Sequence, residues 1–132
     1  MKIAFATQDL ETVDAHFGWA KNIVFYDLDA GGFKFNHVVS FDSNLAEDGN
    51  EDKLVPKIEA LKGCAILYVA AIGGSGAARV VAQKIHPVKV EKPEKITDLL
   101  ERLRVLLNGT PPPWMRKILR EQGEKGADFT DD

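Results

Sequence analysis

The most constraining feature of this 132-residue chain is an almost uniformly apolar run, CAILYVAA, at Cys64–Ala71. A strand with one solvated face alternates apolar and polar residues, whereas a parallel strand covered on both faces is apolar throughout. The run is also far too short to cross a bilayer as a helix. It therefore predicts a buried parallel strand in a sheet that carries helices on both faces.

The rest of the chain supplies the other elements of such a sheet. Lys2–Thr7 is predicted as the first strand, with Ile3 and Phe5 on one face and Ala4 and Ala6 on the other. Further strands are expected at Asn22–Asp29, Phe33–Phe41 and Pro87–Val90, a hairpin turn at Ala30–Gly32, a polar loop at Asp42–Asp52, and helices at Lys53–Leu61, Ala77–Ile85 and from Pro93 to about Asn108. This order opens with a hairpin and then alternates helix and strand, which predicts a mixed α/β sheet in a three-layer fold.

The chain divides into a domain over residues 1–109 and a different segment over residues 110–132. That segment opens with three prolines, which favour polyproline II. A short helix is expected over Trp114–Glu121, followed by disorder over Gly123–Asp132. Its apolar side either packs back on the domain or docks on a partner, and it consists of Trp114, Met115, Ile118 and Leu119.

Composition narrows the class of function. The net charge is −3 and the basic residues are scattered, which argues against a nucleic-acid-binding face. The single cysteine, Cys64, allows no disulfide within the chain and is too little for a standard iron–sulfur site. The N-terminal MKIAFAT runs directly into a strand pattern, without a signal peptide. We therefore expect a cytoplasmic protein that binds neither nucleic acid nor membrane.

A glycine-rich turn, IGGSG at residues 72–76, follows the apolar strand and leads into a helix. Backbone N–H groups and the helix dipole at such a place favour anions. The turn matches neither the dinucleotide fingerprint, because Arg79 stands at the third glycine position, nor a Walker A loop. The candidate anion-binding residues are Gly73, Gly74, Ser75 and Gly76, with Arg79 nearby. A tight turn that simply needs glycine is the alternative.

The sequence shows no catalytic constellation. Ser75 is not at the centre of a Gly-x-Ser-x-Gly elbow. Neither the first strand nor the apolar strand carries the carboxylates that a two-metal hydrolase needs. We therefore expect no catalytic residues and no enzyme activity. Two alternatives are a small nucleotide- or phosphate-binding enzyme that uses Gly73–Gly76, and a pure protein-interaction module.

The three histidines differ in their expected positions. His37 falls on the apolar face of the third strand, together with Phe33, Phe35, Val39 and Phe41, which predicts a partly buried side chain. Cys64 and His86 lie at the amino end of the sheet, either as a pair of ligands or as a buried thiol and a capping histidine. His16 lies in a loop at the carboxyl end, where open α/β sheets bind ligands and where the glycine turn also falls. Neutral imidazole is a good metal ligand, so His16 is the candidate metal-binding residue.

Three stretches, DAHFGWA at residues 14–20, IGGSGAARVVAQKIHPVKV at residues 72–90 and PPPWMRKIL at residues 111–119, carry a resemblance to a known family. The chain resembles the NifX branch of the dinitrogenase iron–molybdenum cofactor-binding family, with its NifX- and NafY-like cluster carriers, from Met1 to about Leu119. The resemblance implies a ribonuclease H-like fold, a five-stranded mixed sheet between helices with strand two antiparallel.

The resemblance also implies a function. Such proteins carry an iron–sulfur cluster precursor of the iron–molybdenum cofactor from the cluster-synthesising radical enzyme to the cofactor-assembly scaffold complex. Related carriers hold the cluster with the histidine of the HFG motif, a role that falls on His16. Phe17 and Trp19 are expected to shield the cluster, and Gly18 to allow a sharp turn. The Gly73–Gly76 turn is expected to stabilise the anionic charge of the cluster.

Overall fold

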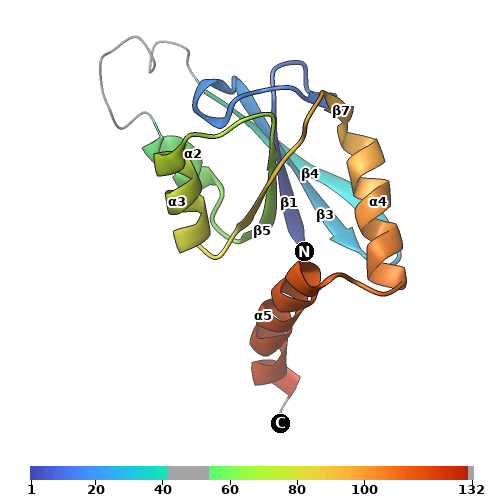
Figure 1. The fold of residues 1–132 in the computed structure, drawn as a ribbon. Helices are drawn as coiled ribbons and strands as arrows, with labels where there is room; N and C mark the ends of the chain where they lie inside the picture. Colours follow the sequence, from blue (N-terminus) through green and yellow to red (C-terminus); the bar gives the residue numbers. More distant parts are fainter. Residues whose placement is uncertain (42–53, 131–132) are drawn as a thin grey trace.

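The computed structural model describes residues 1–41 and 54–130, with side chains as far as Glu121. The polar loop expected at Asp42–Asp52 lies outside the described residues. A central sheet is covered by α2 (Val55–Ala60) and α3 (Gly74–Ala82) on one face and by α4 (Ile96–Asn108) on the other, as Figure 1 shows. This arrangement confirms the mixed α/β architecture that the apolar strand predicts.

The central sheet has five strands in the order β4-β3-β1-β5-β6. Their bounds are Lys2–Thr7 for β1, Asn22–Asp29 for β3, Gly32–Ser40 for β4, Cys64–Val69 for β5 and His86–Lys89 for β6. The strand β3 is antiparallel to both of its neighbours, whereas β1, β5 and β6 run parallel. Every residue of β5 is buried, as its uniform apolarity predicts.

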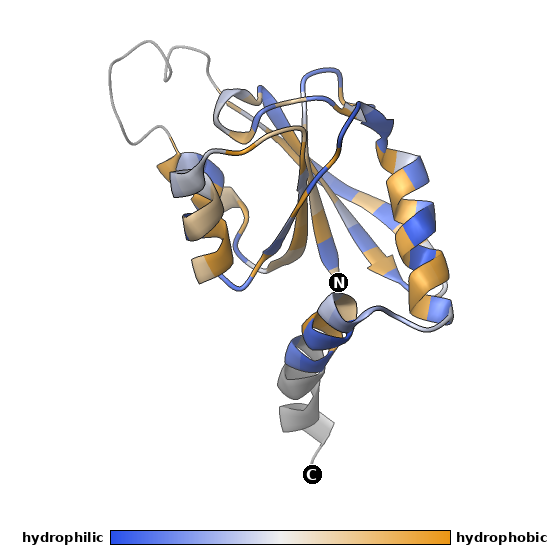
Figure 2. Cartoon of the chain, viewed as in Figure 1, coloured by the Kyte–Doolittle hydropathy of each residue, from blue (hydrophilic) through white to orange (hydrophobic). Residues whose placement is uncertain are grey.

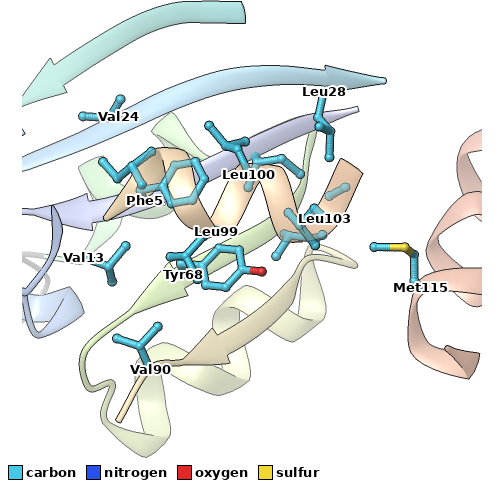
Figure 3. Packing of buried hydrophobic residues seen from close by; sticks show 14 of the residues in the cluster. Phe5, Val13, Val24, Leu28, Tyr68, Val90, Leu99, Leu100, Leu103 and Met115 are labelled. Carbon is cyan, nitrogen blue, oxygen red and sulfur yellow. The ribbon is translucent and has the colours of Figure 1, made fainter. Parts of the chain in front are cut away.

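The two faces of the sheet build two separate apolar clusters. On β1, Ile3 and Phe5 belong to the α4-side cluster, and Ala4 and Ala6 to the α2/α3-side cluster, as their alternation predicts. Figure 3 shows Phe5 and Tyr68 from the sheet beside Leu99, Leu100 and Leu103 of α4. The helix α4 alternates hydrophobic and hydrophilic residues along its length (Figure 2), the pattern of a helix that buries one stripe.

The outer strand β4 departs from the expected alternation. Its register with β3 shifts between Phe25 and Tyr26, which leaves Asn36 as an extra residue in a β-bulge. The expectation that its apolar residues share one face is therefore wrong, because one inserted residue reverses the facing of all that follow. Phe33 packs with the α4-side cluster, whereas Val39 and Phe41 pack with the α2/α3-side cluster.

The helix boundaries follow local chain chemistry. In α2, Pro56 lies in the first turn, and Gly63 beyond the helix has a φ of 87°, which suits glycine. The helix α3 begins at Gly74, earlier than the expected Ala77, and so includes most of the glycine turn. It ends at Ala82, before Lys84 enters the left-handed region with a φ of 63°.

A small ribbon of two strands, β2 (Thr12–Val13) and β7 (Glu94–Lys95), is absent from the sequence-based prediction. The ribbon explains why α4 begins at Ile96 and not at Pro93. The N–H group of Ile96 donates to the carbonyl of Glu11 at 2.9 Å, which fixes the start of the helix. Two-residue strands are too short to show a period of two in the sequence.

The helix α5 (Pro113–Thr130) is longer than the expected Trp114–Glu121 and extends into the segment expected to be disordered. Met115 and Ile118 are buried in the α4-side cluster, which confirms that the apolar side packs back on the domain. The ring of Trp114 stacks on His86, with the ring centroids 4.7 Å apart. Among the residues described, no helix is both long enough and apolar enough to span a membrane.

Candidate functional site

The loop that carries His16 is bound to the end of the apolar strand. The N–H group of Ala70 donates to the carbonyl of Ala15 at 2.9 Å, and that of Phe17 donates to the carbonyl of Ala71 at 2.8 Å. His16 and Ala71 form a parallel bridge, one residue before the glycine-rich turn begins. The expected meeting of the histidine and the turn at the carboxyl ends of β1 and β5 is therefore confirmed.

The imidazole of His16 is held by its own loop. His16 caps a short 3-10 helix, η1 (Phe17–Trp19), and its Nδ1 accepts a hydrogen bond from the N–H group of Gly18 at 3.0 Å. A ring nitrogen that accepts a hydrogen bond carries no proton, so the neutral ring has its proton on Nε2. His16 as a residue is half-buried, at the carboxyl end of the sheet.

Gly18 lies in a tight turn, as expected, but its backbone conformation is not one that requires glycine. Its φ is not in the left-handed region, which only Gly32 and Gly63 occupy among the glycines described. A Cβ at this position would lie 3.4 Å from the ring of His16, an ordinary contact distance. What distinguishes Gly18 is that both of its backbone polar groups are used, because its carbonyl accepts a second hydrogen bond.

The donor to that carbonyl is Lys57, which the sequence reasoning missed. The Nζ of Lys57 lies 3.0 Å from the carbonyl oxygen of Gly18, and its side chain is 6% exposed. The same Nζ lies 5.1 Å from the centre of the Phe41 ring. A sequence signal exists, because Lys57 falls three residues after Leu54 and four before Leu61, on the apolar stripe of α2.

The two aromatic residues of the loop have opposite environments. Phe17 is fully buried in the α2/α3-side cluster, so it anchors the loop to the hydrophobic core. The expectation that it shields a bound cluster is therefore wrong. A Cβ on Gly76 would lie 3.4 Å from the Phe17 ring and 3.3 Å from Ile72, so this glycine allows the ring to approach α3. Trp19, in contrast, is 55% exposed.

The glycine turn presents the amino end of α3 to solvent. Gly73 is the N-cap in an extended conformation, and no side chain caps the helix. Gly73, Gly74 and Ser75 are exposed, so their backbone is accessible to an anion. Arg79 lies instead in the last turn of α3 and lines a groove of about 330 Å³ against Val55 and Glu59 of α2. The structure thus brings the turn to His16 but directs Arg79 towards α2.

The other candidate ligands lie elsewhere. The Cys64 thiol is buried in the α2/α3-side cluster, and burial raises its pKa to about 12. His86 begins β6, and its ring stacks on Trp114. Its pKa is lowered, mainly by burial and to a smaller extent by the positive charge of Lys117. His86 pairs with Ile66 of β5, and Ile66 belongs to the α4-side cluster. Cys64 belongs instead to the α2/α3-side cluster, because a bulge interrupts the start of β5.

His37 has a structural environment. Its ring stacks on Phe25 with the centroids 4.4 Å apart, and its Nδ1 lies 2.7 Å from the side-chain oxygen of Asn36. This is the partly buried histidine that its strand position predicts. Within residues 1–41 and 54–121, no three His, Cys, Asp or Glu side chains gather in a group that could hold a metal ion.

Comparison with known proteins identifies the family. Residues 1–105 match the family described as dinitrogenase iron-molybdenum cofactor. The chain is 58% identical to Protein NifX of Herbaspirillum seropedicae over all of this chain and 90% of that protein. It is 47% identical to Protein NifX of Sinorhizobium fredii over 93% of this chain and 80% of that one.

A solved structure shows the same kind of fold. The apo form of the orange protein from Desulfovibrio gigas superposes with a TM-score of 0.60 at 20% identity, over 84% of this chain and 90% of that chain. This likeness concerns the fold alone. The family match and the NifX relatives, over most of their length, establish that the chain belongs to the dinitrogenase iron-molybdenum cofactor family.

Proposed function

We propose that this protein takes part in the biosynthesis of the iron–molybdenum cofactor. Its task is to bind an iron–sulfur precursor of that cofactor and to deliver it to the cofactor-assembly scaffold. The observation that carries the proposal is the parallel bridge between His16 and Ala71, which joins the histidine loop to the chain just before an exposed glycine turn. The partners are the scaffold complex and the radical enzyme that makes the cluster, and the compartment is the cytoplasm.

In this proposal His16 supplies the protein ligand to the cluster. A carrier must release what it binds, and a single imidazole is easier to displace than a full set of thiolates. Sulfide-rich clusters are anionic, so the backbone N–H groups of Gly73, Gly74, Ser75 and Gly76 stabilise the bound form. Trp19, exposed beside the histidine, shields the cluster from water and oxygen.

The proposal treats the protein as a carrier that performs no catalysis, on a ribonuclease H-like fold. The strand order, with an antiparallel β3 between β1 and β4, agrees with that assignment. In this scheme Phe17 and Gly18 position His16, whereas Arg79 contributes to the charge of the neighbouring α3 surface.

The test compares His16→Ala with the wild-type chain in anaerobic binding of the purified cluster precursor. Retention is followed by the absorbance of the bound cluster after gel filtration. We expect His16→Ala to lose most of the bound cluster. The matched control is His37→Ala, because His37 is a half-buried histidine on the outer strand β4 that stacks on Phe25.

Equal retention by wild type and His16→Ala would refute the assignment of His16. A rise in melting temperature with a nucleotide, in the absence of any cluster binding, would favour the phosphate-binding alternative. If neither ligand binds, an interaction module is the better description. Each of these outcomes is measured on the same purified protein.

A further inference from the structure

Lys57 is a buried cation whose position its own helix does not explain. It lies in α2 with a side chain 6% exposed, and lysine is almost never buried without a specific partner. Removing an ammonium group from water is costly, and an apolar residue would continue the stripe of Leu54, Ile58 and Leu61 at no such cost. The burial of this charge therefore requires a compensating interaction, and it suggests that the lysine has a functional role.

One such interaction is with the loop of the candidate site. Lys57 donates to the carbonyl of Gly18, a residue 39 positions away in the chain, at 3.0 Å. Gly18 in turn donates its N–H group to Nδ1 of His16. A single glycine thus links the ammonium group of α2 to the imidazole of His16, in the loop that bridges to Ala71.

The packing of α2 supports the same link. A Cβ on Gly18 would lie 3.9 Å from Leu54, so the amino end of α2 lies directly against the turn that holds His16. The Phe41 ring, 5.1 Å from the ammonium, adds a favourable cation–π contact. The ammonium group is therefore held in a buried position against this turn.

We propose that Lys57 is a positioning residue for cluster binding. It holds the Phe17–Trp19 turn, which in the cluster-free protein orients His16 for the binding step. This inference rests on the proposed function, because it assigns a role in the binding step at His16. It also explains why the chain keeps a charge on an otherwise apolar helix stripe.

The test uses three variants of the full chain. Lys57→Met keeps the length of the side chain and removes both the charge and the donor. Lys57→Arg keeps a charge and a donor, and is the conservative rescue. Lys62→Met is the matched control, since Lys62 is an exposed lysine just beyond the end of α2. Far-ultraviolet circular dichroism establishes that each variant is folded.

Binding of the cluster precursor is then measured anaerobically, together with the electron paramagnetic resonance spectrum of the bound form. We expect Lys57→Met to bind about tenfold more weakly, the effect of losing one charge-assisted hydrogen bond. Its spectrum should change because the Phe17–Trp19 turn beside the bound cluster is no longer held to α2. Lys57→Arg should bind within about threefold of wild type, and Lys62→Met should match wild type in both affinity and spectrum.

Two results would overturn the inference. One is a folded Lys57→Met that binds the cluster as wild type does, with the same spectrum. The other, decisive if Lys57→Met does not fold, is a folded Lys57→Arg that loses binding. Failure of the proposed function is distinct, because wild type itself would then hold no cluster or His16→Ala would hold it equally well.

Discussion

The N–H group of Gly18 donates to Nδ1 of His16 at 3.0 Å, and this one bond determines how the histidine can act as a ligand. A cluster that binds at Nδ1 must displace the N–H group. A cluster that binds at Nε2 requires the ring proton to move to Nδ1, where two donors would then face each other. Either route breaks the bond between His16 and Gly18.

We therefore expect cluster binding to expose the amide of Gly18. Its hydrogen exchange, measured by mass spectrometry of peptides that span Phe17–Trp19, should be faster in the loaded protein than in the cluster-free protein. The peptide that contains Gly63, which lies at the other end of β5, serves as the internal control. Unchanged exchange at Gly18 in a fully loaded sample would contradict ligation by His16.

Gly76 is expected to tolerate little added volume. A Cβ at this position would lie 3.3 Å from Ile72 and 3.4 Å from Phe17, and Gly76→Val adds two further methyl groups to that Cβ. Overpacking of this kind costs about 1–3 kcal/mol of unfolding free energy. The control is Gly74→Val in the same helix, where nothing lies within 4 Å of a Cβ. Urea unfolding of both variants checks the difference, and equal losses would show that the contact with Phe17 is unimportant.

Asp9 should make the stability of the protein depend on acid pH. Hydrogen bonds from the backbone of Thr12 and Glu11 lower its pKa from 3.8 to about 2. A carboxylate with a depressed pKa contributes stability above the unfolded value, and that contribution is lost as the pH falls through the folded value. Unfolding free energies of wild type and Asp9→Asn should therefore differ most above pH 3.8 and converge towards pH 2. A pH-independent difference would contradict this account.

Cys64 should be unreactive in the folded protein. Its side chain is 4% exposed, and burial raises its pKa to about 12, so the thiol is protonated at neutral pH. Labelling with a thiol reagent should be slow in buffer and fast in denaturant. Cys64→Ala should hold the cluster precursor as wild type does, because Cys64 begins β5 and His16 lies beyond its other end. Rapid labelling of the native protein would be inconsistent with the burial of this thiol.

Met115 should contribute to stability and not to cluster binding. It is fully buried in the α4-side cluster, and Figure 3 shows its side chain on α5. Met115→Ala should lower the unfolding free energy by about 2–5 kcal/mol. Val105→Ala, at an exposed position of α4, should change it by less than about 0.5 kcal/mol. Equal effects of the two changes would mean that α5 is not packed on the domain.

Much of the fold could be predicted because it depends on patterns among residues that are close together in the sequence. The uniform apolarity of β5, the alternation in β1 and the glycines at turns each depend on neighbouring residues. The position of His16 relative to the glycine turn followed as well, because parallel strands bring their carboxyl ends together.

The sequence by itself thus determined the sheet, its helices and the histidine at its carboxyl end. Only the tertiary structure decided the β-bulge at Asn36, the placement of Arg79 against α2 and the reach of Lys57 to Gly18. These features depend on contacts between residues far apart in the chain, and on single inserted residues that leave no period in the sequence. The hydrogen bond from Lys57 to Gly18, 39 positions away in the chain, connects a lysine on an apolar helix stripe to the loop of the candidate site.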